Sequence, residues 1–446
     1  MAASEENPPA TRPRFVRSAA TTFATNLGVA VVSLVNVLIT ARFLGPAGRG
    51  DIALLFTVAG LTATLGNVGV QQAIVNIGGR EPHHRPALAT NAVLLTLLLG
   101  AVVSLALGGL LVAFPGLTGD VSAGLFAFVF VAIPVLIGRV FLQAILDSDY
   151  RFSFSNGIRL IAPVSGVVAN SLLAAFDELT VTTAMTAWVV GQTASTLLLG
   201  WYVARRMEGY GRPDAALARH SLSFGAKAHA SHVLGLGNWR LDQWFVGTIA
   251  GSRELGYYSV AVAWSEALFI LPGALRNVQR PDLVRAARRE AGRRAAQVFR
   301  ICVAVTLPAV LVMVLIAPIL CTTIFGDEFS DAVDDLRWLV PGTFGIVAIR
   351  LLGDALIAQR KPLLPTIAIG IALVVTIVLD IVLIPAYGGE GAAIASLAAY
   401  TVGGVAVAAL FVRGLEVSAG ELVLRPRDIP EFAGTLRERL RAKQPR

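Results

Sequence analysis

Long apolar runs separated by short polar segments occupy the chain from residue 18 to residue 412. When the chain is divided at its clusters of Pro, Gly and charged residues, about twelve runs remain that could each cross a hydrocarbon core ~30 Å thick as a helix. They cover residues 18-42, 50-76, 87-114, 121-146, 154-176, 181-204, 223-250, 255-279, 296-321, 333-358, 363-385 and 390-412. Only helices satisfy their own backbone in lipid over so many segments, and the sequence lacks the ten-residue alternation of a β-barrel. The pattern predicts an all-α, polytopic membrane protein.

The composition supports this prediction and narrows the function. Hydrophobic residues make up 55% of the 446 positions and charged residues 15%, whereas soluble proteins are about 25% charged. No polar segment between residues 18 and 412 is long enough for a soluble catalytic domain, and the sequence has no nucleotide-binding loop, zinc motif or nucleophile with its base. We therefore expect a protein that is not an enzyme and uses no cofactor.

Basic residues determine the expected orientation. The formal net charge is +8, but the basic residues lie in short loops between apolar segments, where they set topology and do not indicate nucleic-acid binding. With a cytoplasmic N-terminus, most of them fall on the cytoplasmic side, while Arg42, Arg49 and Arg253 fall outside. The loop from Asp327 to Asp335 is acidic and also falls outside. The sequence predicts a multi-pass protein of the inner (cytoplasmic) cell membrane with both termini cytoplasmic.

The two halves of the chain are similar at a nearly constant offset. The stretch NVLITARFLGPAGRG from Asn36 aligns with DQWFVGTIAGSRELG from Asp242. The matching positions include Gly45 with Gly251, Gly50 with Gly256, Pro134 with Pro341, Asp147 with Asp354, and Asn170 with Asp380. Six helices separate the copies, and because this number is even, both copies have the same orientation in the membrane. We predict two parallel six-helix lobes, with the substrate site at their interface.

The predicted organisation has five parts. They are a cytoplasmic N-terminal tail (1-17), an N-lobe of helices 1-6 (18-204), a cytoplasmic linker (205-222), a C-lobe of helices 7-12 (223-412) and a basic cytoplasmic tail (413-446). The polar tail leads into an apolar stretch of spanning length without an A-x-A-like cleavage site, so we expect the first segment to remain as a helix.

Three segments carry a family resemblance: ARFLGPAGRGDIALLFTVAGLTATLGNVGVQQAIV from Ala41, LDQWFVGTIAGSRELGYYSVAVAWSEALFILPGAL from Leu241, and LIPAYGGEGAAIASLAAY from Leu383. They resemble helices 1-2, 7-8 and 11-12 of Wzx-type polysaccharide flippases, in the MOP (MATE-like) exporter superfamily. The resemblance implies two lobes that rock around a central cavity and move a polyprenyl-pyrophosphate-linked oligosaccharide to the outer leaflet for surface polysaccharide biosynthesis. It also implies polysaccharide polymerase and glycosyltransferases as partners, besides membrane lipids.

Three other functions remain open. A cation-coupled multidrug or small-molecule antiporter of the same superfamily usually has a carboxylate in the first helix, and no Asp or Glu lies between Arg17 and Arg42. A lipid II flippase typically has two additional C-terminal helices, whereas the chain after residue 412 is polar. A membrane scaffold needs no cavity. A flippase for an anionic lipid predicts a basic cavity between the lobes, and an antiporter for organic cations predicts an acidic one.

Ionisable residues inside spanning segments are costly and are therefore candidates for function. Guanidinium groups offer paired donors to phosphate oxygens, and the family resemblance places the seventh helix along the cavity. The predicted substrate-binding residues are Arg240, Asp242, Arg139, Arg350, Lys227 and Arg159, and the predicted ion-coupling residues are Glu266 and Asp242.

Structural explanations exist for several of these charges. Arg350 and Asp354 are four residues apart on one helix face, where they can neutralise each other inside a lobe. Arg139 and Asp147 belong to a similarly spaced polar row on the repeat-related helix. His229 lies three residues from His232, but no ligand set accompanies them, and Cys302 and Cys321 are separated by roughly 28 Å of helix. The sequence therefore predicts no metal site and no disulfide.

Overall fold

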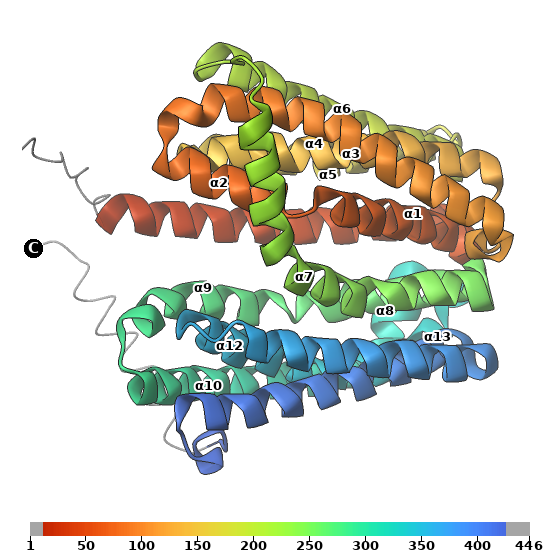
Figure 1. The fold of residues 1–446 in the computed structure, drawn as a ribbon. Helices are drawn as coiled ribbons and strands as arrows, with labels where there is room; N and C mark the ends of the chain where they lie inside the picture. The colour runs from red at the N-terminus through yellow and green to blue at the C-terminus, as the bar shows by residue number, and fades with distance from the viewer. Residues whose placement is uncertain (1–11, 425–446) are drawn as a thin grey trace, which may run out of the picture.

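The computed structural model describes residues 12–424, without the side chains of residues 12–20, 22, 227, 228, 230, 231, 271, 274, 277, 278 and 281. Within residues 12–424 the regular elements are helices and no strand occurs, which confirms the all-α prediction. Figure 1 shows two layers of roughly parallel helices, α1 to α6 in one and α8 to α13 in the other, with α7 passing between them. The chain thus forms two lobes in sequence order.

The first lobe contains α1 (Arg12–Asn67), α2 (Val70–Arg80), α3 (Arg85–Ala113), α4 (Phe126–Ser148), α5 (Phe152–Ala175) and α6 (Val181–Arg206). Short 3₁₀ turns η1 (Pro82–His84), η2 (Pro115–Thr118) and η3 (Ala123–Leu125) connect them. The second lobe contains α7 (Ala215–Phe245), η4 (Val246–Ala250), α8 (Ser252–Ala267), α9 (Ile270–Arg285), α10 (Arg288–Leu315), η5 (Ile319–Thr323), η6 (Asp327–Phe329), α11 (Ala332–Leu339), η7 (Val340–Gly342), α12 (Thr343–Ala358), α13 (Leu363–Leu415) and η8 (Ala419–Glu421).

Two of the helices cross the membrane twice. Seven helices of the described chain are long and apolar enough to span a bilayer, and two of these are 45 residues (Phe23–Asn67) and 53 residues (Leu363–Leu415) long. At 1.5 Å per residue they extend roughly 68 and 80 Å, more than twice a hydrocarbon core ~30 Å thick. Each bends where a glycine has a positive φ, at Gly45 in α1 (66°) and Gly388 in α13 (54°). These bends separate the helices that the sequence predicts as individual spans.

The second and eighth predicted spans, 50-76 and 255-279, are each broken near the middle. In the first lobe, Val68 (φ 48°) and Gly69 (φ 73°) adopt left-handed backbone between α1 and α2. In the second lobe, α8 ends at Ala267 and α9 begins at Ile270, with Pro272 in the first turn of α9. A proline at this position cannot donate to the carbonyl of Leu268 and its ring clashes with that carbonyl, which favours a break here.

α1 begins and α13 ends at the same end of the molecule, which we call the terminal end (Figure 1). The bends at Gly45 and Gly388 lie at the other end, which we call the opposite end. There, the two lobes are joined by polar contacts. Arg42 of α1 donates from Nε to the carbonyl oxygen of Ile324 (2.8 Å) and from Nη2 to that of Thr323 (3.0 Å).

The lobes meet most closely where α1 crosses α8. A Cβ atom added to Gly50 would overlap the carbonyl oxygen of Ser252, and one added to Gly256 would overlap that of Pro46. Since Gly50 matches Gly256 and Pro46 matches Ser252 in the sequence repeat, the contact is reciprocal, as at a two-fold axis. Both copies therefore run in the same direction, as the repeat predicts.

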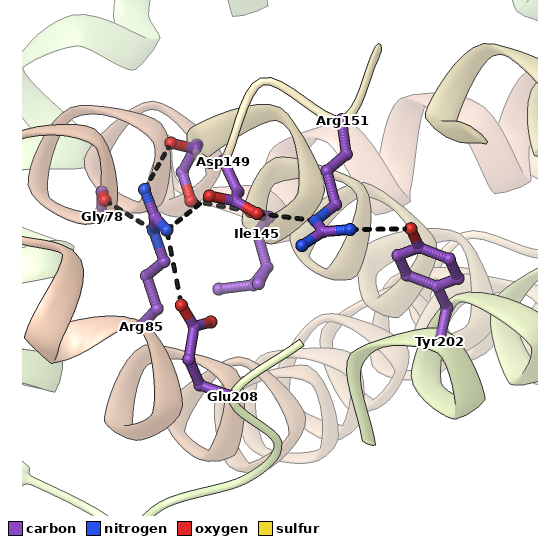
Figure 2. A network of polar contacts seen from close by, with 8 residues as sticks. Gly78, Arg85, Ile145, Asp149, Arg151, Tyr202 and Glu208 are labelled. Carbon is purple, nitrogen blue, oxygen red and sulfur yellow. Dashed lines mark hydrogen bonds and ion pairs between the residues drawn. The ribbon is translucent and has the colours of Figure 1, made fainter. Parts of the chain in front are cut away.

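A network of ion pairs holds the terminal end of the first lobe together (Figure 2). Asp149, after α4, accepts from Arg85 Nη1 (2.6 Å, to Oδ1) and from Arg151 Nε (2.6 Å, to Oδ2). Arg85 also donates to the carbonyl oxygen of Gly78 (2.9 Å), and Arg151 donates to the hydroxyl of Tyr202 (3.1 Å). The α2–α3 connection, the α4–α5 connection and α6 are thereby tied into one unit.

The close crossing predicts a strong effect of a single methyl group. We expect Gly50→Ala to reduce stability by about 2 kcal/mol or more, because overpacking against backbone cannot be relieved by a rotamer change. Gly109→Ala in α3 is the matched control, because a Cβ atom there meets nothing within 4 Å. Thermal unfolding of both variants in detergent measures the difference, and equal melting temperatures would contradict the reciprocal contact.

Candidate functional site

A cavity of about 770 Å³ lies between the lobes. Residues of α1, α4, α5 and α6 line it from the first lobe, and residues of α7, α8 and α9 from the second. Along α1 the lining extends from Asn26 to Thr40, and it resumes beyond the Gly45 bend at Arg49. The 19 residues from Asn26 to Gly45 correspond to roughly 28 Å of helix, so the cavity follows most of the membrane thickness.

Four guanidinium groups line this cavity, those of Arg49, Arg139, Arg159 and Arg240. From helix rise, Arg159 lies roughly 10 Å and Arg139 roughly 14 Å from the terminal end of their helices. Arg240 lies roughly 15 Å and Arg49 roughly 6 Å from the opposite end. Arg139 is close enough to Arg159 for the two to repel each other, and so is Arg49 to Arg240. The cations thus form a column along the cavity.

Polar atoms without partners lie in the same wall. Among the described residues, Nε of Arg49 and of Arg139, Oε1 of Gln192 and Nε2 of Gln243 are buried and make no hydrogen bond. Gln243 is held by Thr57, whose hydroxyl donates to Oε1 across the lobe interface (3.1 Å). Buried donors and acceptors of this kind are costly unless a ligand or water satisfies them. The unsatisfied polar atoms and the guanidinium groups therefore favour a polar, anionic ligand in the cavity.

Glu266 of α8 is the one acidic residue among the described residues that line the cavity. Its Oε1 forms an ion pair with Nη2 of Arg240 on α7, at 2.7 Å. In the sequence, Glu266 has no obvious partner on its own helix, and Asp242 is the acid closest to Arg240. The structure instead pairs Arg240 with Glu266, because Asp242, two residues further along α7, points to a different side of that helix.

The structure places Asp242 inside the second lobe and not in the cavity, which corrects its predicted contact with substrate. Its Oδ2 accepts from the hydroxyl of Tyr258 (2.6 Å) and from that of Ser396 (3.4 Å), and its side chain is buried. Residues two apart on a helix diverge by about 200°, so Arg240 and Asp242 necessarily face different neighbours.

Arg350 also lies outside the cavity lining, against the aromatic rings of Trp239 (4.6 Å) and Phe269 (5.0 Å). Its Nη1 donates to the carbonyl oxygen of Phe269 (3.2 Å), where the helix is broken. The expected pair with Asp354 is not formed, because Asp354 meets Arg280 instead (3.6 Å).

The remaining predicted residues have simpler outcomes. The side chain of Lys227 lies outside the described residues. His229 Nε2 hydrogen-bonds to the carbonyl oxygen of Thr64 (2.9 Å), which gives it a structural role between α7 and α1. Asp147 Oδ1 accepts from the hydroxyl of Ser155 (2.8 Å).

Arg49 is the main site residue that the sequence did not identify. The sequence predicts an outer-loop position for it, because the Gly- and Pro-rich stretch after Gly45 is typical of a connection between helices. In the structure, α1 resumes directly after Gly45, so Arg49 already belongs to the second crossing and is buried. The signal available in the sequence was its match to Leu255, six residues after the start of an apolar span, and this signal was weak.

A second polar cluster lies inside the second lobe. Asp380 of α13 is fully buried, its two carboxylate oxygens have no hydrogen-bond partner among the described residues, and it is close enough to Asp242 for repulsion. Thr376, one turn before Asp380 on α13, donates to Asn238 Oδ1 (3.0 Å), and buried hydroxyls of Tyr258 and Ser396 surround Asp242. Two adjacent buried carboxylates require a proton or a cation.

The repeat provides an internal comparison for this cluster. The residues that match Asp242 and Asp380 in the first lobe are Asn36 and Asn170, and Asn170 Nδ2 donates to Asn36 Oδ1 at 2.8 Å. Two amides satisfy each other directly, whereas two carboxylates cannot, because each is only an acceptor when ionised. An oxygen-rich pair of acids that can hold a monovalent cation or a proton is therefore specific to the second lobe.

The two lobes and the cavity between them define the fold of a multi-pass, all-α membrane protein. Solved structures with this fold include "Lipid II flippase MurJ, inward closed conformation", with a TM-score of 0.74, 14% identity and coverage of 91% of this chain and 88% of that chain. An inward-facing multidrug resistance MATE family transporter of the MOP superfamily has a TM-score of 0.71 and 14% identity, over 89% of this chain and 98% of that chain. A MOP superfamily transporter from Pyrococcus furiosus, described as having a binding pocket of reverse polarity, has a TM-score of 0.61 and 14% identity, over 91% and 96%.

The chain belongs to the polysaccharide biosynthesis protein family, whose sequence model matches residues 39–334. No curated protein sequence matches it. The MOP-type fold, with two parallel lobes, confirms the predicted fold class.

The comparison of the two lobes predicts that the acid pair can be replaced by the amide pair. We expect the double variant Asp242→Asn with Asp380→Asn to fold and to melt at or above the temperature of the unsubstituted protein in cation-free buffer, because it removes two buried like charges. Thermal unfolding with and without Na⁺ measures this. A double variant that unfolds, or that keeps a Na⁺-dependent shift, would contradict the assignment of the cluster as a cation or proton site.

Proposed function

We propose that this protein is a flippase that moves a polyprenyl-pyrophosphate-linked oligosaccharide from the cytoplasmic to the outer leaflet by alternating access between its lobes. The observation that supports it most directly is the charge of the interlobe cavity, which has four guanidinium groups and one carboxylate. A pyrophosphate diester is a dianion, and arginine binds phosphate oxygens with paired donors. The column of cations offers such a group successive partners along its path.

The alternatives fit the cavity less well. An antiporter for organic cations needs negative charge where its substrate binds, and the single acid of the lining, Glu266, is already paired with Arg240. A scaffold needs no cavity, whereas a cavity of about 770 Å³ is present. A lipid II flippase would also use a basic cavity, so the two flippase hypotheses differ only in the sugar and must be separated by substrate.

The distribution of basic residues supports a cytoplasmic terminal end. This end includes Arg85 and Arg151 of the ion-pair network and the basic stretch from Arg280 to Arg294, and basic loops favour the cytoplasm. In this orientation the contacts of Arg42 join the lobes on the outer side, so they have to separate before the substrate leaves. Association with a polysaccharide polymerase and glycosyltransferases remains part of the proposal.

Removal of cavity cations tests the function. We expect Arg139→Gln and Arg159→Gln each to reduce flipping of a fluorescent polyprenyl-pyrophosphate oligosaccharide in proteoliposomes by about tenfold or more, because each removes a charged partner of the phosphate in a poorly solvated cavity. Arg294→Gln, on the exposed surface of α10, is the matched control and should have little effect. Lipid II supplied in place of the oligosaccharide tests the closest rival. Equal rates for all three variants would remove the cavity from the transport path.

The energy source is proposed to act at the acid cluster of the second lobe. Since Asp242 and Asp380 need a cation or a proton, its binding and release can bias the second lobe between two arrangements. We expect flipping by the unsubstituted protein to accelerate when a Na⁺ or proton gradient is imposed across the vesicle. The Asp242→Asn, Asp380→Asn double variant should flip at one rate with or without the gradient. A double variant that still responds to the gradient would place coupling elsewhere.

A further inference from the structure

The pair of Glu266 with Arg240 is the feature of the cavity that binding of an anion does not explain. The other three cavity arginines have no acidic partner among the ion pairs of the described residues, although a carboxylate beside each would lower its cost in lipid. One carboxylate is present, and it pairs with a guanidinium in the half of the column nearer the opposite end. An acid at that position competes with phosphate for the same donors.

The geometry allows an exchange between the two anions. The side chains of Arg240 and Glu266 are 34% and 40% exposed, and both line the cavity, so a ligand in the cavity reaches both. The ion pair joins Nη2 of Arg240 to Oε1 of Glu266, and a guanidinium has five N–H donors, more than one carboxylate can accept from. A pyrophosphate group can offer more acceptor oxygens to this guanidinium than Glu266 does.

Glu266 also has room and a neighbouring charge to move toward. It lies in the last turn of α8, directly before the break at Leu268 and Phe269, and its side chain is 40% exposed in the cavity. Arg350 of α12 lies on the far side of this break and interacts electrostatically with Glu266. The other titratable groups that interact with the pair are Arg49 of α1, Asp242 of α7, Tyr258 of α8 and Tyr400 of α13. A displaced Glu266 is therefore not left without a cation.

We propose that Glu266 is an internal counter-ion that occupies Arg240 when the cavity is empty and is displaced by the pyrophosphate of the substrate. The inference rests on the proposed function and adds a regulatory element to the same site. In the empty protein the pair neutralises one buried charge. In the loaded protein Arg240 binds phosphate, and the return of Glu266 to Arg240 promotes release of the substrate, because both anions compete for one cation.

The test measures binding of inorganic pyrophosphate to the full-length protein in nanodiscs by calorimetry. We expect Glu266→Gln to bind pyrophosphate about three- to tenfold more tightly, since the competitor is gone and solvent in the cavity screens part of the effect. The same variant should flip lipid-linked oligosaccharide more slowly, because release is impaired. Glu254→Gln removes a charge from the same helix at a residue that contacts the backbone of Gly389 and does not line the cavity, so its affinity should match the unsubstituted protein.

The outcomes separate the exchange from a structural ion pair and from the proposed function. A merely structural pair predicts a lower melting temperature for Glu266→Gln with unchanged or weaker pyrophosphate binding, and this result would overturn the proposal. If Glu266→Gln does not fold, Glu266→Asp keeps the charge but shortens the side chain by one methylene, and it should bind pyrophosphate more tightly than the unsubstituted protein; unchanged affinity would again overturn the proposal. If the unsubstituted protein binds no pyrophosphate and flips no lipid-linked sugar, the proposed function fails and the exchange fails with it.

Discussion

The contact between the backbones of α1 and α8 at Gly50 and Gly256 is the constraint on which the arrangement of the lobes depends. Each glycine faces a carbonyl oxygen of the other lobe, so the two helices approach more closely there than side chains allow. Because the contact is reciprocal, it relates the lobes by an approximate two-fold axis. The cavity lies along this same interface, where side chains of α1, α5, α7 and α8 replace the backbone contact.

Charged groups inside the membrane are stabilised in different ways in the cavity and in the two lobes. In the cavity, three of the four cations have no acidic partner among the ion pairs of the described residues, which is tolerable only because the space can hold water or an anionic ligand. In the second lobe, Asp242 and Asp380 share a buried site with hydroxyl and amide oxygens. In the first lobe, the equivalent Asn36 and Asn170 are uncharged, and one amide donates to the other. The two copies of the repeat therefore differ. The first lobe has an uncharged amide pair, and the second lobe has an acid pair that requires a cation or a proton.

Breaks in the helices determine where several of these charged groups lie. α8 ends beside the cavity just after Glu266, and the carbonyl oxygen of Phe269 at the break accepts from Arg350. The break between α1 and α2 allows the first half of α7 to cross the first lobe, where Gly225 lies against the backbone of Gly69. α7 thus connects both lobes, contacting α2 near its beginning and α13 further along (Figure 1). A change in the angle between the lobes must pass through this helix and through the α1–α8 crossing.

The sequence by itself determined the all-α fold class and revealed the repeat, because each of these depends on local properties. Apolar runs of spanning length must be helices in lipid, and matched glycines such as Gly45 and Gly251 record the same backbone conformation in both copies. It also identified Arg139, Arg159, Arg240 and Glu266 as charges that need an explanation, and the structure brings these four to one cavity. What the sequence could not determine is which partner each charge faces.

Only the tertiary structure decided these partners, since they depend on the rotation of each helix about its axis and on contacts between distant segments. Arg240 and Asp242 are neighbours in sequence, yet they face the cavity and the interior of the second lobe respectively. Arg350 and Asp354 share a helix face, but aromatic rings of α7 and the α8–α9 break attract the first and Arg280 the second. The sequence predicts a loop position for Arg49, but in the structure the bend lies at Gly45 and Arg49 belongs to the helix that follows it. The sequence shows which charges are costly to bury in the membrane, whereas packing in three dimensions determines which groups compensate them.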